Sequence, residues 1–235
     1  MKFMQKLLAF TTAFLLSAAI PLTVSAEGEE DAPQDVTAGV AEEIQYKYGL
    51  DEEGNAELYD FLPSDTYEGA VIIPTEIEGH PVDYVGNACF MNAAGITSVT
   101  IPASMIDMGD DVFFGCTGLT EFIVEEGNSY YSVKDGVLLA DEGKFLVAYP
   151  AGKDATSYTV PEGVDEIAPG AFGFAQNLTE VTVTDGVEFI DSWAFAYSNI
   201  QKIDIAGSVY QIDDYAFAYC ESLHDVTLQK GVENI

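Results

Sequence analysis

The residues that could carry acid–base or nucleophilic chemistry are few and far apart. Only two histidines occur, His80 in a Gly-His-Pro turn and His224 beside an apolar strand position. A hydrolase needs a nucleophile and a base within hydrogen-bond reach, and a zinc site needs three or four correctly spaced ligands. Neither histidine has a ligand-spaced partner in the sequence. We therefore expect no catalytic site, no bound metal and no cofactor in this chain.

Carboxylates are abundant, with 40 Asp plus Glu against 8 Lys plus Arg and a formal net charge of -32. Paired carboxylates arise here from abundance and do not indicate glycosidase chemistry. The acidic turns 51–55 and 141–143 lack the alternating oxygen ligands of a calcium loop. Because an acidic surface repels phosphates and anionic headgroups, we expect neither nucleic acid nor a membrane surface as a partner. We also expect no insertion into a membrane once the amino-terminal signal described below is cleaved, since no later segment is long and apolar enough. The acidic surface could simply keep the protein soluble, or it could include a charge-selective binding face.

The three cysteines occupy packing positions rather than a disulfide framework. Cys116 and Cys220 each stand three residues after a phenylalanine, in equivalent positions of a repeated pattern. Cys89 takes a small-residue position of the same pattern. Since Cys116 and Cys220 lie several repeats apart, one bridge cannot join them. We predict three structural thiols.

The elements that would position any site recur with a period of about 23 residues, which is typical of a solenoid of stacked turns. Segments 96–102, 178–183 and 223–228 share a phrase in which apolar residues alternate with polar ones, as in a half-buried strand. Most intervals between phrases are nearly equal, and two are longer: an enlarged turn precedes Ile101, and an insertion precedes Val160. The last apolar residues of the phrases are Ile73, Ile101, Val124, Val160, Val183, Ile205 and Leu228.

Each strand phrase is followed by a return segment that ends in a small residue and a phenylalanine. Stacked turns would place these phenylalanines above one another as an internal ladder. Each buried ring would contribute about 2–3 kcal/mol of burial free energy, which one repeat alone could not supply. The expected ladder contains Phe90, Phe113, Phe172, Phe195 and Phe217.

The amino terminus has the pattern of a secretory signal peptide. Lys2 and Lys6 precede an apolar run over residues 7–20, and Val24-Ser-Ala26 forms a small-residue cleavage site. The run is too short to span a bilayer. We predict a protein that is secreted or displayed on the cell surface, with the signal cleaved near Ala26.

The remaining chain divides into three predicted regions. An acidic flexible linker spans 27–42, and an N-terminal β-hairpin cap spans 43–69. The repeat array spans 70–235, with a β-hairpin insertion at about 129–150. Because the last repeat stops before its phenylalanine, we expect the natural protein to continue beyond Ile235.

These motifs resemble the BspA-like leucine-rich repeat family of bacterial surface proteins, whose units have the same length. The family phrase stands here as Ile96–Pro102, followed by Ile106, Met108-Gly109, Phe113 and Cys116. Segments 77–82, 135–139 and 149–153 also resemble the family's turn and hairpin insertion. Departures are mild: Asn199-Ile200 shortens one unit, and Glu125 and Thr184 replace the strand-terminal proline.

The resemblance implies a leucine-rich repeat solenoid that is right-handed and curved. Short parallel β-strands would line its concave face, and short helical or irregular segments would return the chain. The family is associated with adhesion to extracellular proteins and host cells, and it carries no catalytic motif. Its repeats also occur beside catalytic domains in larger secreted proteins.

Two surfaces could bind a ligand. Outward positions of the predicted sheet form a stripe of threonines and charges that would suit a basic protein patch, although the same residues are common on a solvated sheet. Trp193 and Tyr215 would stack one turn apart and could anchor a glycan or a protein, or could simply cover the phenylalanines. The sheet candidates are Glu121, Glu180, Thr182, Lys202, Asp204, Asp225 and Thr227.

The function we predict is protein–protein or cell-surface adhesion by a secreted repeat protein, with a basic or glycosylated extracellular partner. Two alternatives remain open. The array could be a non-catalytic targeting module of a larger secreted enzyme whose catalytic domain lies beyond residue 235. It could also be a passive spacer.

Overall fold

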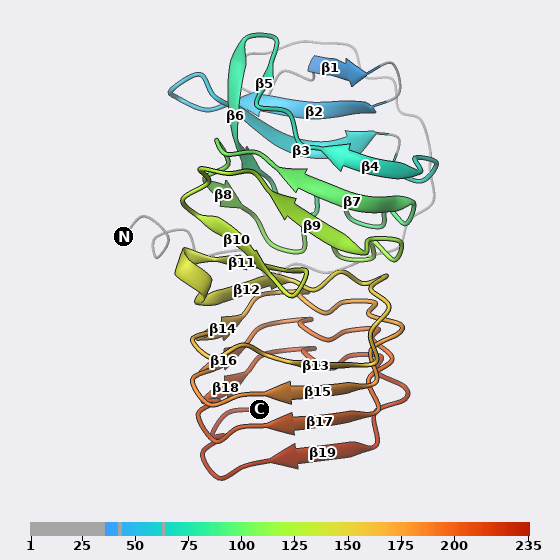
Figure 1. Ribbon diagram of the computed structural model, residues 1–235, viewed down its shortest axis with the longest axis vertical. Coiled ribbons are helices and arrows are strands. Elements are labelled where there is room, and N and C mark those ends of the chain that lie inside the picture. Colours follow the sequence, from blue (N-terminus) through green and yellow to red (C-terminus); the bar gives the residue numbers. More distant parts are fainter. Residues whose placement is uncertain (1–35, 42–43, 63) are drawn as a thin grey trace, which may run out of the picture. The chain divides into compact units, whose positions relative to one another are not determined.

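The computed structural model describes residues 36–41, 44–62 and 64–235 (Figure 1). The predicted signal peptide 1–26 lies outside them. The described chain is a β-solenoid in which seven short strands, one per turn, form two parallel sheets. These strands fall on the seven predicted phrases. The first sheet contains β4 (Gly69–Ile72), β7 (Ile96–Ile101) and β9 (Glu121–Val124). The second contains β13 (Ser157–Thr159), β15 (Glu180–Val183), β17 (Lys202–Ile205) and β19 (Asp225–Leu228).

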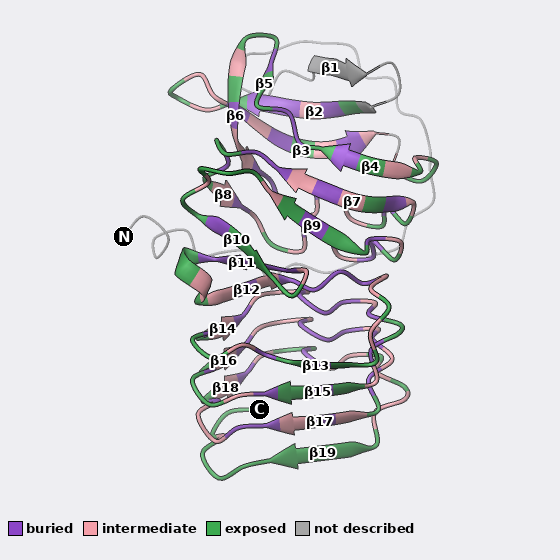
Figure 2. Cartoon of the chain, viewed as in Figure 1, coloured by how far each residue is buried: buried purple, intermediate pink, exposed green. Residues whose placement is uncertain are grey.

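The alternation that predicted the strands also sets their burial. In β15, Val181 and Val183 are buried while Glu180 and Thr182 are exposed, and Figure 2 shows this alternation along the strand. Because side chains alternate between the faces of a sheet, one face packs on the core and the other meets solvent. The inward rows stack in register from turn to turn, as in the pairs Val181↔Ile203 and Ile203↔Val226.

The return segments form a second ladder of strands, which the sequence did not predict. The only helix among the described residues is the 3-10 turn η2 (Asp141–Gly143), so a helical return does not occur in them. Two-residue segments after β7, β13, β15 and β17 pair in parallel instead, because stacked turns bring their backbones to strand spacing. This ladder has two separate parts: β6 (His80–Val85) pairs with β8 (Asp107–Met108), and β14 (Glu166–Ile167) pairs with β16 (Phe189–Ile190), which pairs with β18 (Gln211–Ile212).

Antiparallel strands precede the array. β2 (Ile44–Leu50) and β3 (Ala56–Leu62) pair where the hairpin was predicted, and β3 continues in parallel onto β6, which also pairs with β5 (Glu76–Ile77). Their role as a cap stays a prediction. The linker prediction for 27–42 is wrong over β1 (Val36–Ala41), which pairs with β2. This segment carries no charge and contains two valines and a threonine, which suits it to a strand.

The insertion is a three-stranded meander rather than a hairpin. β11 (Val137–Ala140) and β12 (Phe145–Ala148) lie at the two predicted strands, and β10 (Tyr131–Lys134) adds a third. All four residues of β11 are buried. Leu138 and Ala140 pack into one hydrophobic core, and Val137 and Leu139 pack into another. The meander therefore runs through the stack and divides its core in two.

The predicted phenylalanine ladder is present in two parts. Phe90 stacks on Phe113 with ring centroids 5.6 Å apart, and Phe195 stacks on its neighbours in both adjoining turns. The meander interrupts the series between Phe113 and Phe172. There Tyr149 stacks on Phe172 at 5.2 Å and continues the second part.

The predicted structural thiols are free cysteines in the structure. Cys116 Sγ donates to the Phe90 carbonyl at 3.0 Å, and Cys220 Sγ donates to the Phe195 carbonyl at 3.1 Å. Both thiols thus satisfy the same carbonyl position of an earlier turn. Cys89 and Cys116 are buried, whereas Cys220 is half-buried.

Glycines allow successive turns to approach closely. A Cβ atom at Gly95 would lie 2.0 Å from the Tyr67 carbonyl oxygen, and one at Gly118 would lie 2.3 Å from that of Ala94. Asn177 and Asn199 hold the same position in later turns and donate their side-chain amides to the turn before. At this position, successive turns therefore touch either through the backbone of a glycine or through a side-chain hydrogen bond of an asparagine.

We expect Gly95→Ala to lower the free energy of unfolding by about 1–3 kcal/mol, because the methyl group would overlap backbone that cannot move independently. Gly54→Ala is the matched control, since a Cβ there meets no atom within 4 Å. That control carries only the cost of its positive φ, about 1 kcal/mol. Urea denaturation of both variants measures the difference, and equal losses would contradict the packing argument.

Candidate binding surfaces

The outer face of β13, β15, β17 and β19 presents two rows of polar side chains. Register pairing places Ser157, Glu180, Lys202 and Asp225 side by side in the first row. The second row contains Thr159, Thr182, Asp204 and Thr227. Strands lie about 4.8 Å apart, so neighbours within a row are in interaction range. Six of the seven predicted sheet residues therefore share one surface, which we call the acidic sheet surface.

Lys202 lies at the centre of the acidic sheet surface. Its Nζ is 3.3 Å from the Asp204 carboxylate, and Glu180 and Asp225 flank it in the neighbouring strands. Hydrogen bonds from Thr227 and then from Lys202 lower the pKa of Asp204. The Asp204 carboxylate, followed by Glu180 and Asp225, raises the pKa of Lys202. Three carboxylates thus surround one ammonium group, and two of them have no ion-pair partner among the described residues.

Glu121 does not join this surface. It lies on β9, where it pairs with Ser98 of β7, and β9 belongs to the other first-ladder sheet. The second row of that sheet is apolar at Ile72 and Ile123, which are 63% and 45% exposed. Comparison of the repeats with one another placed Glu121 on the outward side of its strand, where it is exposed. That comparison could not show that the sheet ends at β9.

The aromatic residues form a separate surface on the turns that carry the phenylalanines. Trp193 stacks on Tyr215 with centroids 4.8 Å apart, as predicted. A second row runs through Phe174, Tyr197 and Tyr219, with centroid distances of 4.7 and 4.5 Å. Phe174 was missed, although its place one repeat before Tyr197 is the signal that would have found it. Both faces of the Tyr197 ring are covered, whereas Tyr219 at the end of the row is 61% exposed.

All five of these aromatic residues have left-handed backbone conformations, with φ between 58° and 61°. Equivalent positions of earlier turns hold Ala88, Asn92, Asp111, Gly115 and Gly170, which are small or short polar residues. The left-handed conformation costs a bulky residue about 1–2 kcal/mol. Each stacked pair returns about 0.5–1.5 kcal/mol beyond burial. Stacking of the aromatic rings therefore offsets much of the conformational cost of the left-handed backbone at these residues.

A group of carboxylates lies along the second ladder. Asp191 and Asp213 occupy the same position of successive turns, directly after β16 and β18, and Glu166 lies in β14. Burial, followed by a hydrogen bond with Glu166 and the charges of Glu166 and Asp213, raises the pKa of Asp191 to about 8. Burial also raises the pKa of Glu166. Asp191 is the partner that keeps the proton, because the shared hydrogen bond favours ionised Glu166.

The two histidines are apart, as expected. His80 Nδ1 lies 2.9 Å from the Gly54 carbonyl oxygen and holds a turn, whereas His224 is exposed. Within the described residues there is no cluster of three or more His, Cys, Asp or Glu able to hold a metal ion. That same part of the chain has no helix of the length and apolarity that crossing a bilayer requires.

The sequence profile of BspA type leucine rich repeat regions matches residues 72–135 and 149–235 in six copies. The chain belongs to the BspA-type leucine-rich repeat family. In this BspA-type array the profile omits residues 136–148, which contain the whole of β11 and β12. The matched residues are therefore leucine-rich repeats of the BspA type.

A solved structure with a TM-score above 0.5 supports the fold of the BspA-type array, and two further leucine-rich repeat structures match with lower scores. A leucine-rich repeat protein from Eubacterium ventriosum is 17% identical, with a TM-score of 0.56, over 82% of this chain and 72% of that one. A leucine-rich repeat protein from T. pallidum is 20% identical, with a TM-score of 0.45, over 77% and 78% of the two chains. A leucine rich cell surface protein from Faecalibacterium prausnitzii is 16% identical, with a TM-score of 0.34, over 87% and 94%. No curated protein matches the sequence.

Proposed function

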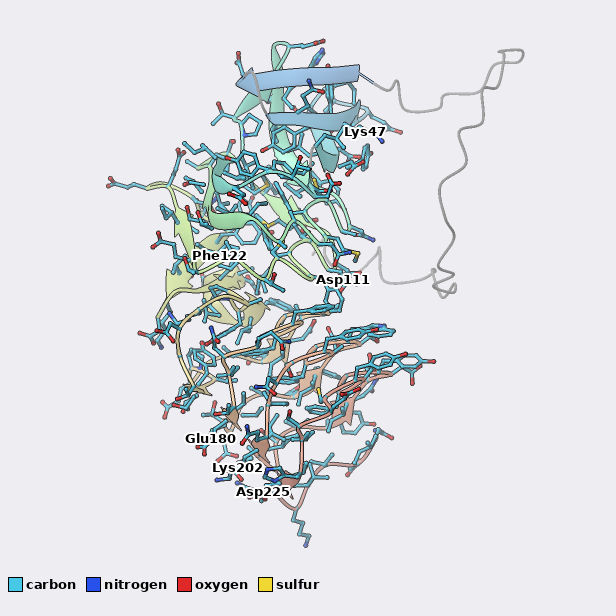
Figure 3. The ribbon with its side chains drawn as sticks, turned by 90° about the vertical axis from the view of Figure 1, so that its right-hand side faces the viewer. Lys47, Asp111, Phe122, Glu180, Lys202 and Asp225 are labelled. Atoms are coloured by element: carbon cyan, nitrogen blue, oxygen red, sulfur yellow. The ribbon has the colours of Figure 1, made fainter. Side chains whose placement is uncertain are left out.

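We propose that this protein is a secreted or surface-displayed adhesion module that binds a basic region of an extracellular protein through the acidic sheet surface. The observation that carries the proposal is the row Glu180–Lys202–Asp225, in which two exposed carboxylates flank one lysine (Figure 3). Asp204 already engages that lysine. Glu180 and Asp225 therefore keep their charge available for a partner.

Charge also favours a basic partner at long range. The chain has a formal net charge of -32, so a cationic protein is attracted before contact. Complementary charge of this kind raises association rates and selects partners, and added salt weakens it. The threonines of the second row, such as Thr182 and Thr227, can donate and accept hydrogen bonds beside the carboxylates.

The shape of the surface favours a protein rather than a small molecule. Its side chains stand on four adjacent short strands and face solvent. Small-molecule sites are concave and bury most of their ligand, whereas protein interfaces are broad and comparatively flat.

Reversal of both flanking charges tests the proposal. We expect Glu180→Lys with Asp225→Lys to weaken binding of an alternating Lys–Thr decapeptide at least tenfold at 50 mM salt. The slope of affinity against salt should also flatten, because fewer charge pairs form. Fluorescence anisotropy with the labelled peptide measures both quantities.

The matched control is Glu52→Lys with Glu76→Lys, which changes net charge equally at exposed positions outside the acidic sheet surface. If the control weakens binding as much as the sheet variant, only net charge matters and the proposed site is wrong. An unchanged affinity in the sheet variant would also reject it.

A further inference from the structure

The first ladder contains one break. β4, β7 and β9 pair with one another, and β13, β15, β17 and β19 do so too, but no described strand pairs with the far edge of β9 or the near edge of β13. The turns that lead into these two strands remain stacked, since Gly152 N donates to the Leu119 carbonyl at 2.8 Å. The break therefore lies along the strands themselves. β10 approaches β9 there without pairing (Figure 1).

The free edge of β13 carries backbone groups suited to a further strand. The Val160 N–H donates to Thr182, and the Thr156 carbonyl accepts from Thr179 and Glu180, so even-numbered residues face β15. Alternation then directs the N–H and C=O groups of Ser157 and Thr159 toward the break. Such unpaired edge groups are a template for an extended chain.

A shallow hollow of about 530 Å³ lies at this edge and is lined by Asp135, Lys153, Ser157, Tyr158 and Thr159. Asp135 comes from the turn between β10 and β11. The hollow therefore combines the free edge of β13 with the tip of the inserted meander.

Lys153 is the unusual member of this lining. A Cβ at Gly136 would lie 2.7 Å from its Nζ, so the ammonium group sits directly over the meander turn. In the described part of the chain its ammonium group forms no ion pair, although acidic residues outnumber basic ones fivefold. An unpaired, half-buried ammonium favours a carboxylate ligand.

Tyr158 supplies a second polar group without a partner. Its side chain is 9% exposed, and its hydroxyl is buried with no hydrogen-bond partner. Burial first, and then the Asp135 charge, raise the pKa of Tyr158, which keeps the hydroxyl protonated. The Tyr149 hydroxyl, whose ring lies 5.3 Å from that of Tyr158, is buried without a partner in the same way. Tyr158 therefore adds a neutral side chain to the lining of the hollow.

We propose that the break between β9 and β13 binds an extended peptide segment of a partner protein that carries one acidic side chain. The segment's backbone pairs with the outer edge of β13, and its carboxylate contacts Lys153. A sugar acid could satisfy Lys153 but not the alternating backbone groups, which only an extended peptide matches. The two sites share only Ser157 and Thr159 of the edge strand β13. The charged residues of the acidic sheet surface take no part, so this inference stands independently of the proposed function.

The probe is the peptide acetyl-Ser-Thr-Val-Glu-Val-Thr-Ser-amide, with binding to the full chain measured by calorimetry. We expect Lys153→Met to weaken binding at least tenfold, because the stem remains and the ammonium is lost. Lys230→Met, at an exposed lysine of the turn after β19, is the matched control and should leave affinity unchanged. Replacing the peptide's Glu by Gln should weaken wild-type binding equally and have no further effect on Lys153→Met.

A second measurement leaves the protein untouched. The same peptide N-methylated at alternate backbone nitrogens cannot pair with a strand edge, and we expect its binding to be lost. Equal binding of the methylated peptide would overturn the proposal, as would equal binding to Lys153→Met or no binding of the parent peptide at millimolar concentration. Tighter binding of glucuronic acid than of the peptide would assign the hollow to carbohydrate and also overturn it.

Discussion

Replacing Phe195 by alanine is expected to lower the free energy of unfolding by about 3–5 kcal/mol. Phe195 is fully buried, and its ring lies 4.7 Å from Phe172 and 5.2 Å from Phe217, measured between centroids. Its loss removes an inner ring of the longer ladder and leaves a cavity that the stacked backbone cannot close. The residues on either side belong to different turns, so the damage reaches three turns at once.

Equilibrium unfolding in urea measures this loss. Phe195→Leu should lie between wild type and the alanine variant, because it keeps part of the buried volume. Tyr130→Ala is the control, since that ring is 50% exposed and its loss should change stability by about 0.5 kcal/mol or less. A Phe195→Ala variant as stable as the Tyr130→Ala variant would contradict a stabilising role for the ladder.

The second large effect is an unusual dependence of stability on pH. Burial and the neighbouring carboxylates raise the pKa of Asp191 to about 8, whereas an unfolded Asp titrates near 4. The folded state therefore binds more protons between these values, and stability falls as pH rises. The contribution is fully present below about pH 4 and is lost as pH rises through about 8.

The variant that isolates this effect is Asp191→Asn, which keeps a hydrogen-bond donor for Glu166 and removes the charge. Each pKa unit corresponds to about 1.4 kcal/mol, so the effect exceeds that of ordinary surface substitutions. We expect the variant to melt at a higher temperature than wild type at pH 8.5, and the difference to shrink toward pH 5.

The titratable groups that act on Asp191 are Glu166, Asp213 and Asp110. Asp165 acts in turn on Glu166. Because the whole chain is acidic, general charge repulsion also weakens the fold at high pH. Asp214→Asn is the control, since it removes one charge at an exposed neighbouring position. Melting curves of Asp191→Asn and Asp214→Asn that shift identically with pH would refute a specific role for the Glu166–Asp191 pair.

The sequence predicted the first ladder well because strand alternation and the regular repeat determine both which side chains face inward and which stack. The contact of Trp193 with Tyr215 followed from that repeat alone. The same reasoning put Lys202, Asp204 and their neighbours on one outer surface.

What the sequence did not predict depends on backbone geometry between repeats. Four strands of the second ladder, β8, β14, β16 and β18, have two residues each and are too short to show alternation. The long interval before Val160 indicated an insertion, but only the structure shows that β11 is buried on both sides and that the ladder breaks between β9 and β13. Glu166 and Asp191 lie about one repeat apart in the sequence, which indicates neighbouring turns but not a shared proton.

The measurement that tests the central claim most directly is carbodiimide labelling of carboxylates, read by mass spectrometry, with and without the Lys–Thr decapeptide. If the acidic sheet surface is the binding site, the peptide will protect Glu180 and Asp225 from labelling and leave Glu52 and Glu76 unprotected. Protection of all four residues to the same degree, or of none, would contradict binding at this surface.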